Sequence, residues 1–294
     1  FMLGISCGGV LSAYLLENLG WAKVIIIGGA IPLVLVVALL LKLPESPQYL
    51  IKNAQQDKAQ RILERLQGTA FVEPVQLVLP QAESNLNESP AKMVLGKYLW
   101  GSSMLWLCCF TSLLVFYLLT SWMPTILKTA DFSTQQFSLI AAIFPFGGVI
   151  GAIVMGWYMD KVNPTKVIKF SYLFAVILFL VAGFVSTNIV LLGITIFLIG
   201  ALLVGAQSSL LPLAALFYPS VCRAVGVSWM HGIGRIGAIL GAFFGSLIFT
   251  FNLSLSGIFF ILAIPTFISF IALTLKVMHE KSSHKAILEA KKAA

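Results

Sequence analysis

Eight long apolar segments divide this sequence, and each has a length that can cross a lipid bilayer as a helix. Of the 294 residues, 59% are hydrophobic and only 10% are charged, whereas soluble domains carry about 25% charged residues. The composition therefore excludes a soluble domain and predicts an all-α fold, a polytopic membrane helix bundle. The segments are expected over residues 1–16, 21–43, 99–122, 137–159, 167–185, 189–217, 224–250 and 253–277.

The net charge of +8 comes from loops between the apolar segments, so it indicates membrane topology rather than nucleic-acid binding. With the loop 44–98 placed in the cytoplasm, nearly all lysines and arginines fall on that side. The opposite side then holds only Lys23 and Lys128. Because positively charged loops remain inside, we predict a multi-pass protein of the inner (plasma) membrane. The loop 44–98 and the C-terminus are predicted to be cytoplasmic.

The chain is expected to have four parts. They are two membrane helices over 1–43, a cytoplasmic linker over 44–98, a six-helix bundle over 99–278 and a cytoplasmic tail over 279–294. Because Phe1 opens directly inside an apolar run, we expect the chain to be part of a longer protein.

The linker contains signals for short helices. Ser46-Pro47 and Ser89-Pro90 each combine an N-cap residue with proline at the first helical position. Residues 56–66 have apolar side chains at helical spacing, which predicts an amphipathic helix at the membrane face. Residues 68–88 show no period and are expected to form a flexible linker.

The sequence lacks the residue clusters of an enzyme, a metal site or a disulfide framework. Its four cysteines show no CxxC or CxxH spacing, and two of its three histidines lie in the tail. No cofactor, metal or catalysis is predicted. The cysteines are Cys7, Cys108, Cys109 and Cys222.

Arg235 is the candidate residue that the apolar pattern makes most unusual. It lies about ten residues into the segment 224–250, near the middle of the hydrocarbon core. A guanidinium at that depth costs at least ~2.5–3.5 kcal/mol on insertion scales. No Asp or Glu lies inside any apolar segment to neutralise it. Its partner is therefore an anionic substrate or protein that this chain does not contain.

Three more residues are candidates for a substrate site. His231 precedes Arg235 by four residues and shares its helix face, and histidine can carry a coupling proton near neutral pH. Arginine grips a carboxylate in a planar, bidentate way. Gln207 could hydrogen-bond a substrate, and Tyr117 could stack on an aromatic ring. The alternatives that remain open are an ordinary hydrogen-bonded helix histidine for His231, interhelical hydrogen bonding for Gln207, lipid or packing contact for Tyr117, and a structural ion pair for Arg235.

Small residues recur at a spacing of four in two segments, which predicts close helix packing. Gly147 and Gly151 form one such pair, and Gly237, Gly241 and Gly245 form a longer row. Trp122 is interpreted as an anchor at the membrane interface.

Several motifs point to one family. Gly156-Trp-Tyr-Met-Asp160-Lys161 has the form G-x-x-x-D-[RK], and Leu43 is followed by Pro-Glu-Ser-Pro. Tyr117 precedes Ser121-Trp-Met-Pro-Thr, Gly205 is followed by Ala-Gln, and Tyr218 through Gly241 reads Y-P…R-x-x-G…G-I-G-R-x-G-A. These motifs resemble the major facilitator superfamily, and within it most closely the aromatic acid:proton symporters.

The resemblance implies helices five to twelve of a twelve-helix transporter, with residues 1–43 as the last two helices of the N-terminal half. Helices one to four would then carry substrate contacts and the partner of Arg235. A gating motif of Gly156, Asp160 and Lys161, with Arg223, would latch the cytoplasmic side.

One departure from the family pattern follows Lys161. The pattern continues x-G-[RK]-[RK], whereas this sequence reads Val162-Asn-Pro-Thr-Lys166. Because asparagine can adopt the left-handed conformation that glycine usually supplies, we expect Asn163 to close this turn.

By this resemblance the sequence predicts a secondary active transporter that takes up a small, aromatic carboxylate with protons by alternating access. The full-length protein is expected to be a monomer. Within the same class, a carrier of sugars, other metabolites or drugs, or an exporter, remains an alternative. Alternatives of another class are a channel or receptor, although no repeated filter is visible. The last alternative is that the chain is a non-functional truncated product.

Overall fold

The structure is a computed structural model that describes residues 2–53, 55–68, 89–129, 134–250 and 254–293. The chain divides into two compact units, Gly8–Leu86 and Asn87–Ala294 with Phe1–Cys7, and each is considered by itself. Most of the predicted flexible linker, 69–88, lies outside the described residues. Every regular element among those described residues is a helix, so the predicted all-α fold is confirmed.

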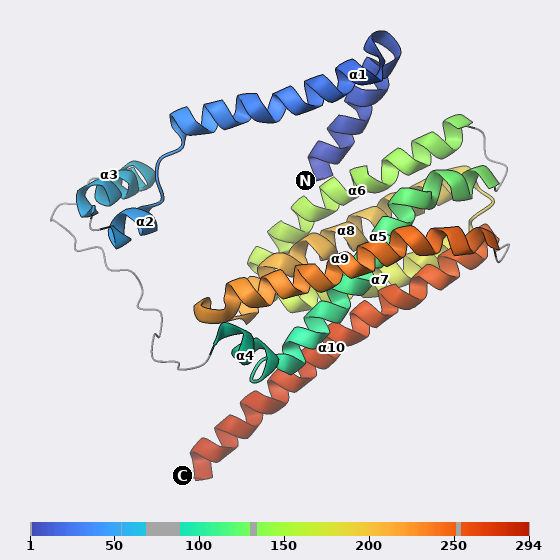
Figure 1. The fold of residues 1–294 in the computed structure, drawn as a ribbon. Helices are drawn as coiled ribbons and strands as arrows, with labels where there is room; N and C mark the ends of the chain where they lie inside the picture. The colour runs from blue at the N-terminus through green and yellow to red at the C-terminus, as the bar shows by residue number, and fades with distance from the viewer. Residues whose placement is uncertain (1, 54, 69–88, 130–133, 251–253, 294) are drawn as a thin grey trace. The chain divides into compact units, whose positions relative to one another are not determined.

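The first unit contains a bent membrane-length helix and two short ones. Helix α1 (Met2–Lys42) turns sharply at Gly20, whose φ of 76° is a conformation that glycine adopts without the strain of a side chain (Figure 1). Helices α2 (Pro47–Lys52) and α3 (Gln56–Gln67) follow, close to the predicted starts. They pack together, and this contact buries Leu50 and Ala59.

The second unit begins with the short helix α4 (Pro90–Leu95), which Ser89 caps as predicted by accepting a hydrogen bond from the Lys92 N–H. Six long helices follow. They are α5 (Leu99–Thr129), α6 (Thr134–Lys161), α7 (Pro164–Phe184), α8 (Ile189–Phe217), α9 (Ser220–Thr250) and α10 (Leu255–Ala293). Most extend beyond the predicted apolar segments, because a helix continues past the part that hydrocarbon would cover.

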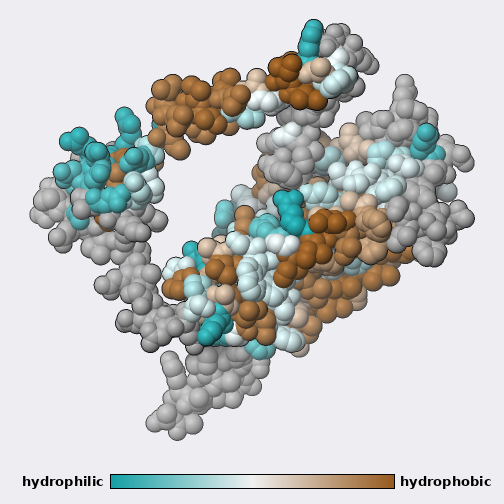
Figure 2. All heavy atoms as spheres, in the orientation of Figure 1, coloured by the Kyte–Doolittle hydropathy of each residue, from teal (hydrophilic) through white to brown (hydrophobic). Residues whose placement is uncertain are grey.

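Seven helices among the described residues are long and apolar enough to cross a membrane. One is Gly20–Lys42, and the other six are in α5 to α10. The eighth predicted segment, 1–16, lies in a part of α1 whose side chains are almost all undescribed. Large apolar side chains remain exposed on these helices, as Figure 2 shows in brown over α1 and over the face formed by α9 and α10. Exposed apolar surface on this scale fits a lipid environment.

The long helices of the second unit associate mainly in pairs. Helix α5 packs against α9, α6 against α8, and α7 against α10, while α10 also contacts α5 (Figure 1). Two of these pairs, α6 with α8 and α5 with α9, depend on glycine for their close approach. A Cβ at Gly147 or Gly151 of α6 would overlap the backbone of Phe197 or Ala201 on α8. The predicted close packing at this pair is confirmed.

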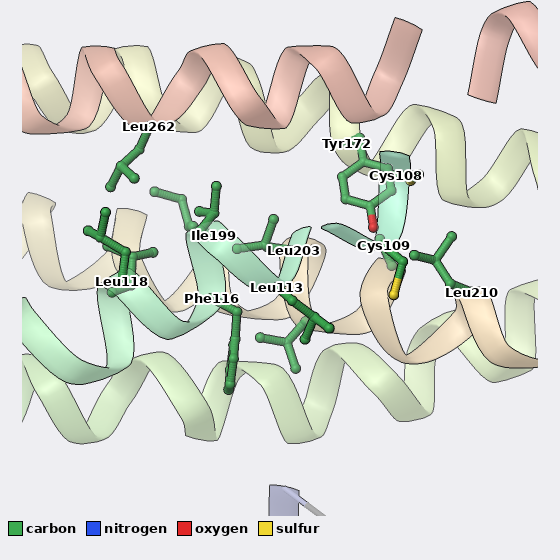
Figure 3. Close-up of a cluster of buried hydrophobic side chains, with 14 of the residues drawn as sticks. Cys108, Cys109, Leu113, Phe116, Leu118, Tyr172, Ile199, Leu203, Leu210 and Leu262 are labelled. Carbon is green, nitrogen blue, oxygen red and sulfur yellow. The ribbon is translucent and has the colours of Figure 1, made fainter. Parts of the chain in front are cut away.

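Buried hydroxyl groups connect α5 to the helices behind it. Thr111 and Ser269 share a hydrogen bond of 2.6 Å between their hydroxyl oxygens, and the Ser112 hydroxyl bonds the Tyr172 hydroxyl. Figure 3 shows the Tyr172 ring reaching toward Cys108 and Cys109 from a neighbouring helix. In an apolar interior each hydroxyl needs such a partner, so this cluster fixes how α5, α7 and α10 face one another.

The turn between α6 and α7 differs from the prediction. Asn163 has φ −52° and ψ 117°, which is not left-handed. Its side-chain oxygen instead accepts hydrogen bonds from the N–H groups of Thr165 and Lys166. The expectation of a left-handed Asn163 is therefore wrong. Pro164 at the first helical position makes an N-cap the better use of this asparagine, because the helix begins directly after it.

Candidate binding site

Arg235 lies at the centre of α9, with 15 residues of the helix before it and 15 after it. The opposite side of α9 is buried against α5, so Arg235 falls on the exposed side. Its Nη1 donates a hydrogen bond of 3.1 Å to the Tyr117 hydroxyl. A guanidinium has five N–H donors, and the other four have no hydrogen-bond partner among the described residues.

Glycines on α9 create this pairing by letting α9 lie directly on α5. A Cβ at Gly237 or Gly241 would overlap the carbonyl oxygen of Phe110 or Leu114. The predicted glycine row is thus confirmed as a packing seam. Because the two backbones are this close, the long Arg235 side chain reaches across to α5 rather than along its own helix.

Trp122 packs at the Gly245 end of the same seam, and its predicted role as an anchor at the membrane interface stays a prediction. Its ring nitrogen donates a hydrogen bond of 2.7 Å to the Ala242 carbonyl, and its ring lies where a Cβ of Gly245 would be. Trp122 is half-buried. The acceptor of the indole N–H is a carbonyl on the neighbouring helix α9, and the sequence of α5 alone does not reveal it.

Aromatic contacts orient the Tyr117 ring. Phe116 lies edge-on to it with ring centroids 5.3 Å apart, and Phe116 in turn lies 6.0 Å from Phe144 of α6. The Tyr117 hydroxyl accepts from Arg235, so its own proton is free to be donated to a second group. The structure therefore brings two of the four predicted substrate residues into direct contact.

The other two predicted residues, His231 and Gln207, are both half-buried. His231 lies one turn before Arg235 on α9, as its spacing requires. The structure gives neither side chain a hydrogen bond to a described residue. Ser208 and Ser209, beside Gln207 on α8, bond to carbonyls of their own helix. No hydrogen bond joins His231 or Gln207 to Arg235 or Tyr117 among the described residues.

The predicted gating residues lie at the end of the bundle where α6 ends and α9 begins. The Lys161 ammonium lies 3.6 Å above the Trp157 ring, and the Arg223 Nε donates to the Tyr218 carbonyl at 3.3 Å. Asp160 is exposed and has no ion pair among the described residues. Gly156 is also exposed, with open space where a Cβ would be. Asp160 and Arg223 are therefore not paired in this conformation.

The sequence of the chain matches the model of a known family. Its model, the Major Facilitator Superfamily, matches residues 1–220 and, in an overlapping match, residues 105–294. The chain belongs to the major facilitator superfamily. Since it combines this family with several membrane-length helices, it is a multi-pass membrane protein.

Among major facilitator relatives, the chain is 38% identical over 284 residues to the 4-hydroxybenzoate transporter PcaK of Pseudomonas aeruginosa, covering 94% of the chain and 62% of that protein. It is 36% identical over 276 residues to a gallate transporter of Pseudomonas putida, covering 93% and 61%. A benzoate transport protein of Acinetobacter baylyi is 30% identical over 278 residues, covering 92% and 57%. The chain thus spans about three fifths of the length of these relatives, all of which are named as transporters rather than enzymes.

Sequence reasoning missed the buried polar groups that hold the bundle in shape. Tyr218, noted only as part of a motif, donates from its hydroxyl to Ser102 of α5 inside the protein. Lys276, assigned to the cytoplasmic side, is only 3% exposed, pairs with Glu280 and lies 4.5 Å from the Phe217 ring. A lysine four residues before a glutamate was the available signal for that pair.

Proposed function

We propose that this chain is part of a secondary active transporter that carries a small aromatic carboxylate across the inner membrane by alternating access, coupled to protons. The observation that carries the proposal is Arg235. It stands midway along a membrane-length helix with four N–H donors unpaired among the described residues, beside a tyrosine held by aromatic contacts. The names of the relatives, which refer to 4-hydroxybenzoate, gallate and benzoate, support the class of substrate.

The geometry suits a carboxylate attached to a ring. Two guanidinium N–H groups grip the two carboxylate oxygens, and the Tyr117 hydroxyl donates its free proton to one of them. The Tyr117 ring then lies near the carboxylate end of the substrate, where an aromatic ring packs edge-on or offset. His231, one turn away, would take up the coupled proton, and Gln207 would bond a ring substituent.

The wider arrangement is also a proposal. Residues 1–43 would be the last two helices of an N-terminal half, 44–98 the cytoplasmic linker and 99–278 the C-terminal half, with the tail in the cytoplasm. In that orientation Asp160, Lys161 and Arg223 lie at the cytoplasmic end, where they would latch and release the gate with Gly156 at the helix contact. Transport would run inward, and the full-length protein would act as a monomer.

The test is uptake of radiolabelled 4-hydroxybenzoate by the full-length protein in proteoliposomes, with and without an imposed proton gradient. Uptake should require the gradient, and unlabelled benzoate should compete while glucose does not. Arg235→Gln should lower uptake at least a hundredfold, because a bidentate charged contact of about 3 kcal/mol is lost. The matched control is Lys128→Gln, which removes a cation from the last turn of α5, and this variant should transport normally. Parental uptake by Arg235→Gln would remove the basis of the proposal.

A further inference from the structure

One patch of positive charge on the bundle contains two lysines, Lys166 and Lys169, that have no role in the proposed transport cycle, next to Lys161 of the proposed gate. It lies at the hairpin where α6 ends at Lys161 and α7 begins at Pro164. The hairpin carries Lys161, Lys166 and Lys169 but a single carboxylate, Asp160. None of these lysines forms an ion pair among the described residues, where Glu280 is already bonded to Lys276. Three cations in nine residues thus have no anionic partner in the part of the chain that the structure describes.

Exposed aromatic rings lie beside two of these lysines, Lys161 and Lys169. Trp157 is 55% exposed and Phe170 is 48% exposed. The Lys161 ammonium lies 3.6 Å from the Trp157 ring centroid, and the Lys169 ammonium lies 5.1 Å from that of Phe170. Tryptophan gathers at the level of lipid headgroups, where its ring is half in the apolar region. The rings therefore place the lysine ammonium groups at headgroup depth.

Below the lysines, each helix continues as an exposed apolar row. On α6 the row runs through Ile153 and Ile150, and on α7 through Phe174 and Ile177. Each row is spaced by three or four residues, so it stays on one face of its helix over at least two turns. A ligand with an anionic head and long apolar tails matches both the lysines and these rows, whereas a soluble anion matches only the lysines.

The backbone of the hairpin adds little to anion binding. The N–H groups of Thr165 and Lys166, which would otherwise point out of the α7 N-terminus, are bonded to the Asn163 side chain. Binding must therefore depend on lysine side chains. Lys166 and Lys169 are three residues apart, which brings their side chains to one side of the first turns of α7.

We infer that the Lys161–Lys169 hairpin is a docking surface for an anionic phospholipid, with the headgroup between Lys166 and Lys169 and the acyl chains along the rows of α6 and α7. Attraction of a surface lysine to anionic lipid corresponds to about fivefold in affinity. The two lysines of α7 together should therefore favour phosphatidylglycerol over phosphatidylcholine by about 25-fold.

The experiment follows quenching of Trp157 fluorescence by brominated lipids in the detergent-purified full-length protein, with a Trp157→Phe variant to subtract the other tryptophans. Brominated phosphatidylglycerol should quench Trp157 at about 25-fold lower concentration than brominated phosphatidylcholine. In Lys166→Gln/Lys169→Gln this preference should disappear. Lys92→Gln/Lys97→Gln, which removes the same charge from α4 and the start of α5, should retain it.

Three results would overturn the inference. One is equal quenching by the two lipids in the parent protein. Another is an equal loss of the lipid preference in Lys166→Gln/Lys169→Gln and in Lys92→Gln/Lys97→Gln, which would mean diffuse attraction to a positive surface. The third is displacement by an equal concentration of inorganic phosphate, which would mean an ion site that ignores the acyl chains. Should the glutamine variant not fold, Lys166→Arg/Lys169→Arg keeps the charge and must retain the preference. All of these readouts are independent of transport, so the inference can fail while the proposed function stands.

Discussion

The glycine seam between α5 and α9 predicts opposite outcomes for two substitutions in one helix. Gly237 faces α5, and a Cβ there would overlap the Phe110 carbonyl oxygen. Gly232 lies five residues earlier on the exposed side, with no atom within 4 Å of the same Cβ position. Gly237→Ala forces two backbones apart, whereas Gly232→Ala only adds a methyl group to open space.

The magnitudes follow from these contacts. Alanine is favoured over glycine inside a helix by roughly 0.5–1 kcal/mol, and both variants gain this. Overpacking costs about 1–3 kcal/mol and applies to Gly237→Ala alone, since its neighbour is backbone that has no rotamer to change. We therefore expect Gly232→Ala to be neutral or slightly stabilised. Gly237→Ala should be less stable than Gly232→Ala by about 2 kcal/mol.

Buried cysteines supply the assay. Cys108, Cys109 and Cys222 are free and buried, so a thiol-reactive fluorescent dye reports the temperature at which the bundle opens. Gly237→Ala should open at a lower temperature than Gly232→Ala in the same detergent. Gly237→Ala should also bind substrate more weakly, because moving α9 lengthens the 3.1 Å hydrogen bond from Arg235 to Tyr117. Equal opening temperatures for the two variants would refute the close contact on which the site depends.

Three further substitutions test single contacts. Tyr117→Phe keeps the ring but removes the hydroxyl that accepts from Arg235, and it should raise the KM for uptake about five- to tenfold with little change in maximal rate. Trp122→Phe removes the N–H that bonds the Ala242 carbonyl, and it should lower stability by about 1 kcal/mol in the thiol assay. Tyr172→Phe leaves the Ser112 hydroxyl without its partner inside the bundle, and a loss of about 1–3 kcal/mol is expected; parental stability would show that this bond contributes nothing.

Local sequence features were sufficient to predict the long helices and the glycine faces that pack. Hydropathy located the six long helices of the second unit, because each needs about 20 apolar residues to span hydrocarbon. The glycine spacing on α9 identified the face that packs, a property that one helix carries by itself. Arg235 and Tyr117 were both named as candidates, but the hydrogen bond between these residues, 118 positions apart, was not predicted, because the partner of Arg235 was expected outside this chain.

Features that depend on a neighbouring helix were not predictable in the same way. Trp122 was interpreted from its position near a helix end, but its acceptor is a carbonyl on α9. The sequence does not show whether the hydroxyl of Ser112 or Tyr172 bonds its own helix or a neighbouring one, and in the structure the two bond each other. The prediction for Asn163 was wrong for a different reason. Asparagine is common both in left-handed turns and at helix N-caps, and the glycine of the family pattern favoured the left-handed turn.

The energetics of Arg235 are the reason for proposing that it binds a substrate carboxylate rather than forming an ion pair within the described bundle. Placing a guanidinium at mid-span costs at least ~2.5–3.5 kcal/mol, and a hydrogen bond from a charged donor to a neutral phenol returns about 1.5–3 kcal/mol at most. The contact with Tyr117 alone therefore returns at best about the minimum cost, and it leaves four donors without a hydrogen-bond partner among the described residues. An arginine already neutralised by a carboxylate of its own bundle would have little to gain from an anionic substrate. One that is oriented but only partly compensated gains most when a carboxylate arrives, and it can release that carboxylate when water returns to the site.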